Sequence, residues 1–212
     1  MEDSKKVPAV VIRRLPRYYR YLSELLKQGT ARISSNALSK KMNVTASQIR
    51  QDFNYFGGFG QQGYGYNVEY LYNEIGKILG ISDGNKMIII GMGNLGRALA
   101  SHSNFEKRGF KLTGLFDNNS EIIGSELNGI KILSIDMLER FLKENHVDIA
   151  VLTTPRKPVQ EIADRLVKCG IKGILNFSYA ELSLPDGVSV ENVHISDPMM
   201  ILSYKIKHEN EQ

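Results

Sequence analysis

The chain of 212 residues has no tryptophan, one cysteine and no apolar run near the length that spans a membrane. Cys169 alone can form neither an internal disulfide nor a Cys-rich zinc site, so we expect no metal. The N-terminal stretch MEDSKKVPAV lacks the apolar core of a signal peptide, which makes a cytoplasmic location the expectation. The length allows two small domains but not a nucleotide domain together with a large catalytic domain.

Acidic residues are nearly absent from positions 5–50, where 11 Lys and Arg residues accompany a single acid, Glu24. The net charge of the whole chain is only +4, so the excess of positive charge is concentrated in this segment. Such a block favours a polyanionic partner, with double-stranded DNA the leading candidate. A solvated basic face is the alternative.

The basic segment carries the signals of three short helices. Leu and Tyr residues recur at helical spacing from Pro16 until Gly29 ends the pattern. In SSNALSKKM, Ser34 or Ser35 can cap a second helix, and Thr45 stands in capping-box spacing before a third, ASQIRQDFNYF. Two short helices joined by a tight turn are typical of a helix-turn-helix.

The last of these helices has one apolar and one polar face. Ile49, Phe53 and Phe56 should face the core, which leaves the polar residues free to reach base edges in a major groove. Arg50 could clamp a guanine, or it could form a surface ion pair with Asp52 or Glu24.

The glycine-rich stretch GGFGQQGYGYN, residues 57–67, predicts the wing of a winged helix, with a plain hairpin linker as the alternative. A fourth helix in VEYLYNEIGKILG and turn residues in ISDGN then mark a domain boundary near 81–85. The candidate DNA-binding residues are Arg14, Ser35, Thr45, Ser47, Gln48, Arg50, Gln51, Tyr55, Gly60, Gln61, Gln62, Gly63 and Tyr64.

The stretch KMIIIGMGNLGRALA has the spacing of a dinucleotide-binding turn. An apolar strand runs into Gly91, Gly93 and Gly96, and a second strand, FKLTGLFD, ends in Asp117, 21 residues beyond the last glycine. A carboxylate at that place can accept hydrogen bonds from the adenosine ribose and would repel a 2′-phosphate, so NAD(H) is the expected cofactor. Asp117 could also be a simple cap of the strand end.

Further strands are expected at VDIAVLTTP and IKGILNFS, with an amphipathic helix between them. Ligands of open α/β sheets bind at the carboxyl ends of strands, so residues there could line the far half of the cofactor, although ordinary loop structure would give the same pattern. The candidate cofactor-binding residues are Gly91, Met92, Gly93, Asn94, Leu95, Gly96, His102, Asp117, Thr153, Thr154, Pro155, Asn176, Phe177 and Ser178.

The sequence shows no catalytic constellation, so we assign no catalytic residue. The four histidines are scattered, and the pair Ser178–Tyr179 lacks the Tyr-x-x-x-Lys spacing of short-chain dehydrogenases. Two alternatives to a nucleotide sensor stay open at this point: a small NAD-dependent oxidoreductase with an accessory domain, and a CoA- or nucleotide-binding module.

Together and in order, RLPRYYRYL, SSNALSKKMNVTASQIRQDFNYFGGFGQQGYGYNV, GMGNLGRALA, GFKLTGLFD and CGIKGILNF resemble the Rex redox-sensing transcriptional repressors over nearly the whole chain. The resemblance implies an α/β fold with an N-terminal winged-helix domain (1–85), a Rossmann domain (86–196) and a C-terminal helix and tail (197–212) exchanged within a homodimer. It also implies that NADH releases the repressor from operator DNA, and that Arg20 reports to the partner's exchanged segment.

The C-terminal segment independently predicts a helix that needs a partner. Asp197 can cap it, with Pro198 at its first position, and its apolar face consists of Met199, Met200, Leu202 and Ile206. Packing on its own domain is the alternative to exchange.

Some positions depart from the family pattern. Gln51, Gln61 and Gln62 stand where basic residues are usual, which predicts less salt-dependent DNA binding. His102 stands where some members of the family have Tyr, and the stretch NVHISDPMM departs from the family's usual start of the exchanged helix.

Overall fold

The computed structural model describes residues 7–57, 59–61, 64–102 and 105–208. The chain divides into two compact units, Met1–Asp83 and Gly84–Gln212. The division falls within the turn segment 81–85. Each unit is described by itself below.

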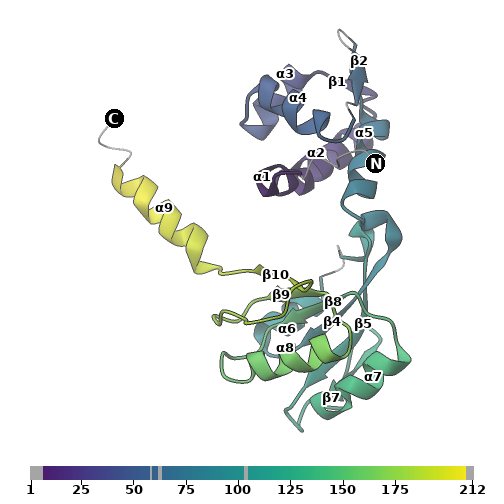
Figure 1. The fold of residues 1–212 in the computed structure, drawn as a ribbon, viewed down its shortest axis with the longest axis vertical. Coiled ribbons are helices and arrows are strands. Elements are labelled where there is room, and N and C mark those ends of the chain that lie inside the picture. The colour runs from purple at the N-terminus through teal and green to yellow at the C-terminus, as the bar shows by residue number, and fades with distance from the viewer. Residues whose placement is uncertain (1–6, 58, 62–63, 103–104, 209–212) are drawn as a thin grey trace. The chain divides into compact units, whose positions relative to one another are not determined.

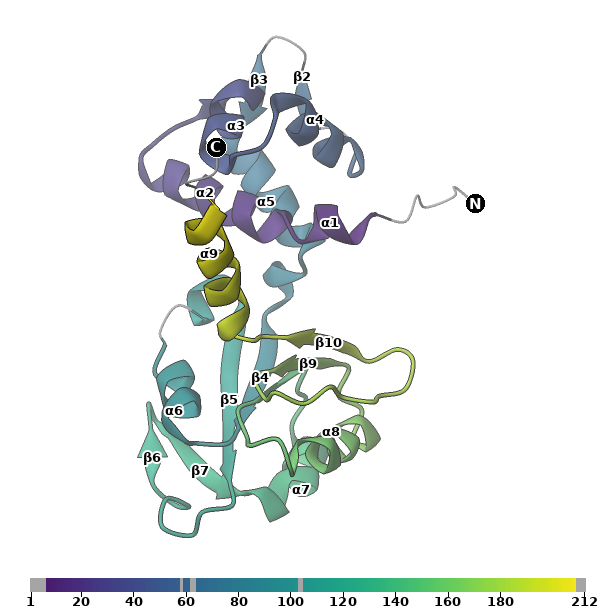
Figure 2. The ribbon, with the colours of Figure 1, turned by 90° about the vertical axis from the view of Figure 1, so that its left-hand side faces the viewer.

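Unit 1 is a helical domain with a small antiparallel sheet in the strand order β1-β3-β2 (Figures 1 and 2). Its elements are α1 (Ala9–Ile12), α2 (Leu15–Lys27), β1 (Arg32–Ile33), α3 (Ser35–Met42), α4 (Ala46–Asn54), β2 (Gly60–Gln61), β3 (Gly65–Asn67), α5 (Val68–Ile78) and the 3₁₀ turn η1 (Ile81–Asp83). The four expected helices are confirmed as α2 to α5, and the short α1 is an addition to them.

Local side-chain caps set the starts of three of these helices. Ser34 accepts a hydrogen bond from the Ala37 amide at 3.0 Å, and Thr45 accepts one from the Gln48 amide at 3.0 Å. Asn67 caps α5 in the same way. The third helix ends at Asn54 rather than at Phe56, two residues earlier than the pattern predicts.

The core of unit 1 is formed by the inward faces of its helices and sheet. Ile49 and Phe53 of α4 are buried there as expected, whereas Phe56 is only partly buried. The other fully or nearly fully buried residues are Leu15, Tyr18, Leu22, Leu25, Ile33, Leu38, Met42, Phe59, Tyr66, Val68, Leu71 and Ile75.

Unit 2 contains a seven-stranded sheet in the order β10-β9-β8-β4-β5-β7-β6, parallel except for the pair β6–β7. Its elements are β4 (Asn85–Ile90), α6 (Asn94–Ala100), η2 (Glu106–Arg108), β5 (Phe110–Asp117), β6 (Glu126–Leu127), β7 (Ile130–Ser134), η3 (Ile135–Met137), α7 (Leu138–Glu144), β8 (Ile149–Leu152), α8 (Val159–Lys168), β9 (Gly173–Asn176), β10 (Ser189–Asn192) and α9 (Ser196–His208).

The parallel strands follow the 3-2-1-4-5-6 order of a Rossmann fold, with β4 as the first strand and β7, β5, β8, β9 and β10 around it. Alternate residues of β4 enter different cores: Ile88 and Ile90 pack with α7 and α8, while Met87 and Ile89 pack on the side of α6. Figure 1 shows α7 and α8 in one layer against the sheet. The expected fold class, a winged helix joined to a Rossmann-like domain, is confirmed.

The C-terminal helix α9 begins at Ser196, so Asp197 lies in its first turn rather than at its cap. The helix therefore begins two residues earlier than the predicted cap at Asp197 would place it. None of its residues is buried. Across the part of the chain that the structure describes, no helix has the length and apolar character to cross a membrane.

Candidate nucleotide pocket and candidate DNA interface

Two glycines of the turn between β4 and α6 are required by close backbone approach. Gly91 has φ +99°, and a Cβ built on it would lie 2.9 Å from the carbonyl carbon of Thr153. A Cβ on Gly96 would lie 1.9 Å from the carbonyl oxygen of Gly91. Larger residues at these two positions would push α6 away from the turn and from β8.

Gly93 differs from the other two glycines because a Cβ built on it would meet nothing within 4 Å. The open space lies directly before α6, where the pyrophosphate of a bound dinucleotide sits in Rossmann folds. The packing of the protein itself therefore does not require glycine at this position.

Asp117, at the end of β5, is hydrogen-bonded to the glycine turn. One carboxylate oxygen accepts a hydrogen bond from the Met92 amide, and the other accepts one from the Asn119 amide at 2.8 Å. The carboxylate therefore both caps local backbone and faces the pocket, so the simple cap and the ribose contact are compatible.

The two threonines after β8 have different roles. The Thr153 hydroxyl hydrogen-bonds the Gly91 carbonyl at 2.6 Å and lies 3.1 Å from the Ile90 carbonyl, so it braces the turn. Thr154 Oγ1 is buried and has no hydrogen-bond partner among the described residues. An orphaned hydroxyl on a pocket wall fits a group that accepts or donates a hydrogen bond there.

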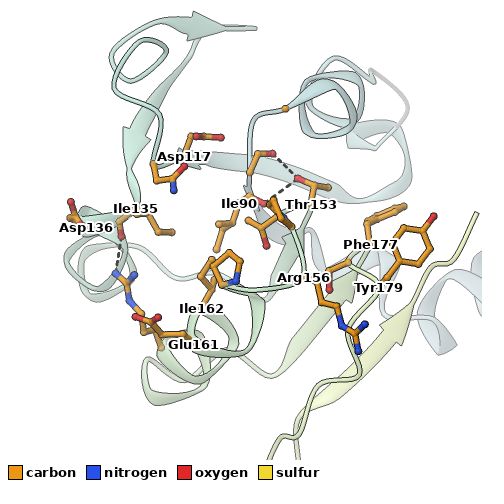
Figure 3. A pocket seen from close by; sticks show the side chains of 18 residues that line it. Ile90, Asp117, Ile135, Asp136, Thr153, Arg156, Glu161, Ile162, Phe177 and Tyr179 are labelled. Carbon is orange, nitrogen blue, oxygen red and sulfur yellow. Dashed lines mark hydrogen bonds between the residues drawn. The ribbon is translucent and has the colours of Figure 1, made fainter.

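These residues surround a pocket of about 720 Å³ at the carboxyl ends of β4, β5, β8 and β9 (Figure 3). This is the point at which the strand order reverses, the usual ligand site of such sheets. The pocket contains eight of the predicted cofactor residues: Gly91, Gly93, Asp117, Thr153, Thr154, Pro155, Phe177 and Ser178.

Other pocket residues were missed by the sequence interpretation. They are Ile90, Asn118, Ile135, Asp136, Arg156, Pro158, Glu161, Ile162, Arg165 and Tyr179. Ile135 and Asp136 follow β7, a strand that was not predicted. A Rossmann half has the order β-α-β-α-β, which requires a third strand between residues 117 and 147. The carboxyl end of that strand would have indicated Ile135 and Asp136 as pocket residues.

An ion pair supports the wall formed by η3 and α8. Arg165 Nε lies 2.5 Å from Glu139 Oε1, and its Nη2 donates to Glu139 Oε2 at 2.9 Å and to the Ile135 carbonyl at 2.8 Å. These hydrogen bonds from Arg165 lower the pKa of Glu139 to about 2.

Some predicted cofactor residues lie elsewhere. Met92, Asn94, Leu95 and Gly96 belong to the turn and to the start of α6 and do not line the pocket. Asn176 is completely buried, and its side chain bonds only groups of the protein, so the structure gives it an internal role.

His102 is also outside the pocket. It follows α6, which carries the chain from the carboxyl end of β4 back to the start of β5, and it lies against Phe105 with a ring separation of 5.3 Å. It lines a different hollow of about 380 Å³ together with Met87 and Lys111, near the starts of their strands. The direction of α6 accounts for this position, and the expected contact of His102 with the cofactor stays a prediction.

The candidate DNA interface is the helix-turn-helix α3–α4 with the β2–β3 wing (Figure 2). Arg50 donates from Nη1 to Ser35 Oγ at 3.0 Å, so two candidate residues are joined across the two helices. The alternative ion pair of Arg50 with Asp52 is wrong, since Asp52 pairs with Arg14.

Arg14 and Gln48, both candidate DNA contacts, are bound to the buried Asp52. Arg14 donates from Nε and Nη2 at 2.7 Å each, Tyr18 Oη donates at 2.8 Å, and Gln48 Nε2 donates at 2.9 Å. Burial alone would raise the pKa of the Asp52 carboxyl, but these hydrogen bonds outweigh it and lower the pKa. Burial and the same carboxylate raise the pKa of Tyr18.

The wing is described in part. Gln62 and Gly63 lie outside the described residues, as does the side chain of Gln61. Tyr64 is 72% exposed, and the Arg32 guanidinium lies 6.0 Å from its ring centre and donates to its carbonyl at 3.3 Å. Arg32, on β1, is thus a basic residue beside the wing that the sequence interpretation did not name.

Two family profiles match the chain, one for each unit. The family described as "Putative DNA-binding protein N-terminus" matches residues 6–54, and the family described as "CoA binding domain" matches residues 82–180. A winged helix on the same chain as a Rossmann-like nucleotide pocket defines the class: a DNA-binding regulator with a nucleotide-binding domain.

Whole-chain relatives identify the family within that class. The chain is 54% identical over 209 residues to the redox-sensing transcriptional repressor Rex of Thermoanaerobacter pseudethanolicus, covering 99% of this chain and 93% of the relative. It is 50% identical over 207 residues to Rex of Clostridioides difficile, covering 98% and 99%.

Solved structures indicate the same family as the whole-chain relatives. RSP, a Rex-family repressor, in complex with β-NAD+ and operator DNA is 53% identical with a TM-score of 0.91, covering 96% of this chain and 94% of that one. RSP in complex with β-NADH is 49% identical with a TM-score of 0.90, covering 97% of each. The chain belongs to the Rex family of redox-sensing transcriptional repressors, and it is a transcription regulator rather than an enzyme.

Proposed function

We propose that the protein is a homodimeric repressor that binds double-stranded operator DNA through unit 1 and is released when NADH occupies the pocket of unit 2. The observation that carries this proposal is the pocket itself. Of the three glycines Gly91, Gly93 and Gly96, only Gly93 leaves open space, and Asp117 lines the pocket at the end of β5. Thr154 Oγ1 is buried and has no hydrogen-bond partner among the described residues. These features fit NAD(H).

In this proposal each part of the dinucleotide contacts different residues of the pocket. Asp117 takes the adenosine ribose and Gly93 the pyrophosphate, and the nicotinamide half then extends over the ends of β8 and β9. NADH and NAD+ differ by a hydride and one positive charge at the nicotinamide ring. The residues that discriminate them therefore belong to the end of the pocket around Phe177.

Operator binding is assigned to the helix-turn-helix and the wing, with the candidate residues given above. Arg50, held by Ser35, is placed to read a base edge in the major groove, a contact worth about 1–3 kcal/mol when it is bidentate. Arg14 and Gln48 contribute by positioning α4 through Asp52 as well as by any direct contact.

The decisive experiment titrates operator-bound protein with NADH and with NAD+ and follows release by fluorescence anisotropy. We expect NADH to weaken operator affinity by about 5–150-fold, the usual range of allosteric coupling, and NAD+ to leave it intact. Equal effects of the two nucleotides would contradict the proposal. CoA serves as the control ligand, since a general nucleotide-binding module would respond to it.

Homodimer formation is supported by apolar surface that the single chain leaves exposed. Six large side chains of α9 are between 57% and 67% exposed: Met199, Met200, Ile201, Leu202, Tyr204 and Ile206. An apolar hollow of about 330 Å³ also lies on the α6 side of the sheet, over β4, β8 and β9. Exposed apolar patches of this kind mark association sites.

The assembly is tested by sedimentation of the full chain and of Leu202→Glu. We expect a dimer for the unchanged protein and monomers for the variant, with weakened operator binding because half-site contacts are no longer linked. Lys205→Glu, also on α9, is the matched control that changes charge without removing apolar surface. A Leu202→Glu protein that remains dimeric would remove α9 from the interface.

A further inference from the structure

The buried amide of Asn176 ties the pocket wall to the segment that leads into α9. Its Nδ2 donates to the Ala180 carbonyl at 2.9 Å and to Asn192 Oδ1 at 2.8 Å, and its Oδ1 accepts from the amide and the hydroxyl of Ser178. The Val193 amide also donates to the Asn176 carbonyl at 2.8 Å. The loop after β9 and the end of β10 are thus held as one piece.

A stacked pair of rings continues this connection. Tyr179, which lines the pocket and is 64% exposed, stacks on His194 with ring centres 5.6 Å apart and an interplanar angle of 20°. Figure 3 shows Tyr179 beside Phe177 at one end of the pocket. The contact joins the nicotinamide end of the pocket to the residues just before α9.

His194 also contacts the first turn of α9. Its Nδ1 lies 3.7 Å from Asp197 Oδ2, and its carbonyl accepts a hydrogen bond from the Asp197 amide at 3.2 Å. A shift of the His194 ring therefore acts directly on the start of the helix.

Two buried polar atoms without partners are found at this edge of the sheet. Within the described ranges, Thr154 Oγ1 and His194 Nε2 are the only buried side-chain nitrogen or oxygen atoms that lack a hydrogen bond. Thr154 follows β8 and His194 follows β10, the two neighbours of β9. An unsatisfied buried group destabilises the structure around it, so a ligand that reorders this edge can change the energy of the segment.

We infer that the Tyr179–His194 stack couples the nucleotide pocket to α9, with Tyr179 in contact with the nicotinamide half and His194 as a positioning residue. The inference rests on the proposed release by NADH. The bound nicotinamide ring holds the Tyr179 side chain in one position. Tyr179 in turn positions the His194 ring, and His194 positions the first turn of α9. The stack thereby transmits occupancy of the pocket without itself supplying most of the binding energy.

The test measures two constants for each protein: the Kd for NADH by fluorescence without DNA, and the operator Kd with and without saturating NADH. The variants are Tyr179→Ala, His194→Ala and their double variant. Tyr179→Phe, which keeps the ring, and His146→Ala, an exposed histidine paired with Asp148, are matched controls. Sedimentation checks that each protein keeps its assembly.

We expect His194→Ala to bind NADH and operator separately almost as the unchanged protein does, while the effect of NADH on operator affinity falls by about tenfold or disappears. Tyr179→Ala removes a pocket contact and weakens NADH binding as well, so its operator Kd is measured at saturating NADH, where the effect of NADH should fall by the same factor. The double variant should be no worse than either single one, because both remove the same contact. The two controls should keep the full effect.

An unchanged NADH effect in both Ala variants would overturn the inference, as would additive losses in the double variant. A loss confined to the NADH Kd would overturn it too, because it would make the stack a binding surface only. Failure of the proposed function has a different signature: the unchanged protein itself would show no NADH effect on operator binding.

Discussion

Arg14 and Asp52 form a bidentate ion pair whose two N–O distances are both 2.7 Å and whose carboxylate is completely buried. The pair joins the residue just before α2 to the second half of α4. The carboxylate also accepts hydrogen bonds from Tyr18 and Gln48. The orientation of α4, the helix to which DNA contacts are assigned in the proposed function, is therefore set by a charge in the core of unit 1. Its orientation does not depend on surface contacts alone.

Removal of this carboxylate should destabilise the protein strongly. Asp52→Ala leaves the Arg14 guanidinium and the Tyr18 hydroxyl without their partner, and we expect a loss of about 3–5 kcal/mol of unfolding free energy. Denaturant unfolding measures it, with Glu24→Ala, an exposed acid of the same unit, as the control. Equal stability of the two variants would show that the network contributes little.

The same pair predicts a loss of stability in acid. Because the pKa of Asp52 is lowered in the folded state, its contribution is complete above the unfolded pKa of about 3.9 and is lost as the pH falls through the folded value. Unfolding followed from pH 6 to pH 2 should show a steeper decline for the unchanged protein than for Asp52→Asn. Parallel curves would contradict this.

A basic residue at position 51 should restore salt dependence to operator binding. Gln51 is exposed on α4, and in Gln51→Lys we expect the log–log slope of operator affinity against salt to steepen by about 0.9, the value for one phosphate contact. Gln28→Lys adds the same charge at the exposed end of α2 and serves as the control. An unchanged slope in Gln51→Lys would mean that position 51 does not meet a phosphate.

Two glycines of one turn should respond differently to alanine. In Gly93→Ala the added Cβ meets no protein atom within 4 Å, so the melting temperature should stay unchanged while NADH affinity falls at least about tenfold, or ~1.4 kcal/mol. In Gly96→Ala the Cβ would lie 1.9 Å from the Gly91 carbonyl oxygen, so both quantities should fall. NADH binding that survives Gly93→Ala would remove the pyrophosphate from that space.

The ion pair of Arg165 with Glu139 should make a smaller contribution, also lost in acid. The pKa of Glu139 is lowered to about 2, so its contribution is present above about 4.3 and disappears as the pH falls toward 2. Since the Glu139 side chain is 39% exposed, solvent screening reduces the effect, and Glu139→Gln should cost no more than about 1 kcal/mol. Glu144→Gln removes the exposed pair with Arg140 and is the control.

The sequence by itself determined the elements whose signals are local. Caps at Ser34 and Thr45 depend on bonds to residues three positions ahead, and the roles of Gly91 and Gly96 follow from a spacing that only glycine satisfies, so these features were predictable. The resemblance of the motifs to Rex repressors, confirmed by whole-chain relatives, carried the function.

The tertiary structure decided what depends on residues far apart in the chain. Asp52 reads as a surface residue of a polar helix, and only the approach of α2, 38 positions away, makes it a buried partner of Arg14. His102 lies near the starts of β4 and β5, because α6 carries the chain back from the carboxyl end of β4. Such pairings arise from how helices and strands pack, and no local pattern encodes the distance between side chains on separate elements.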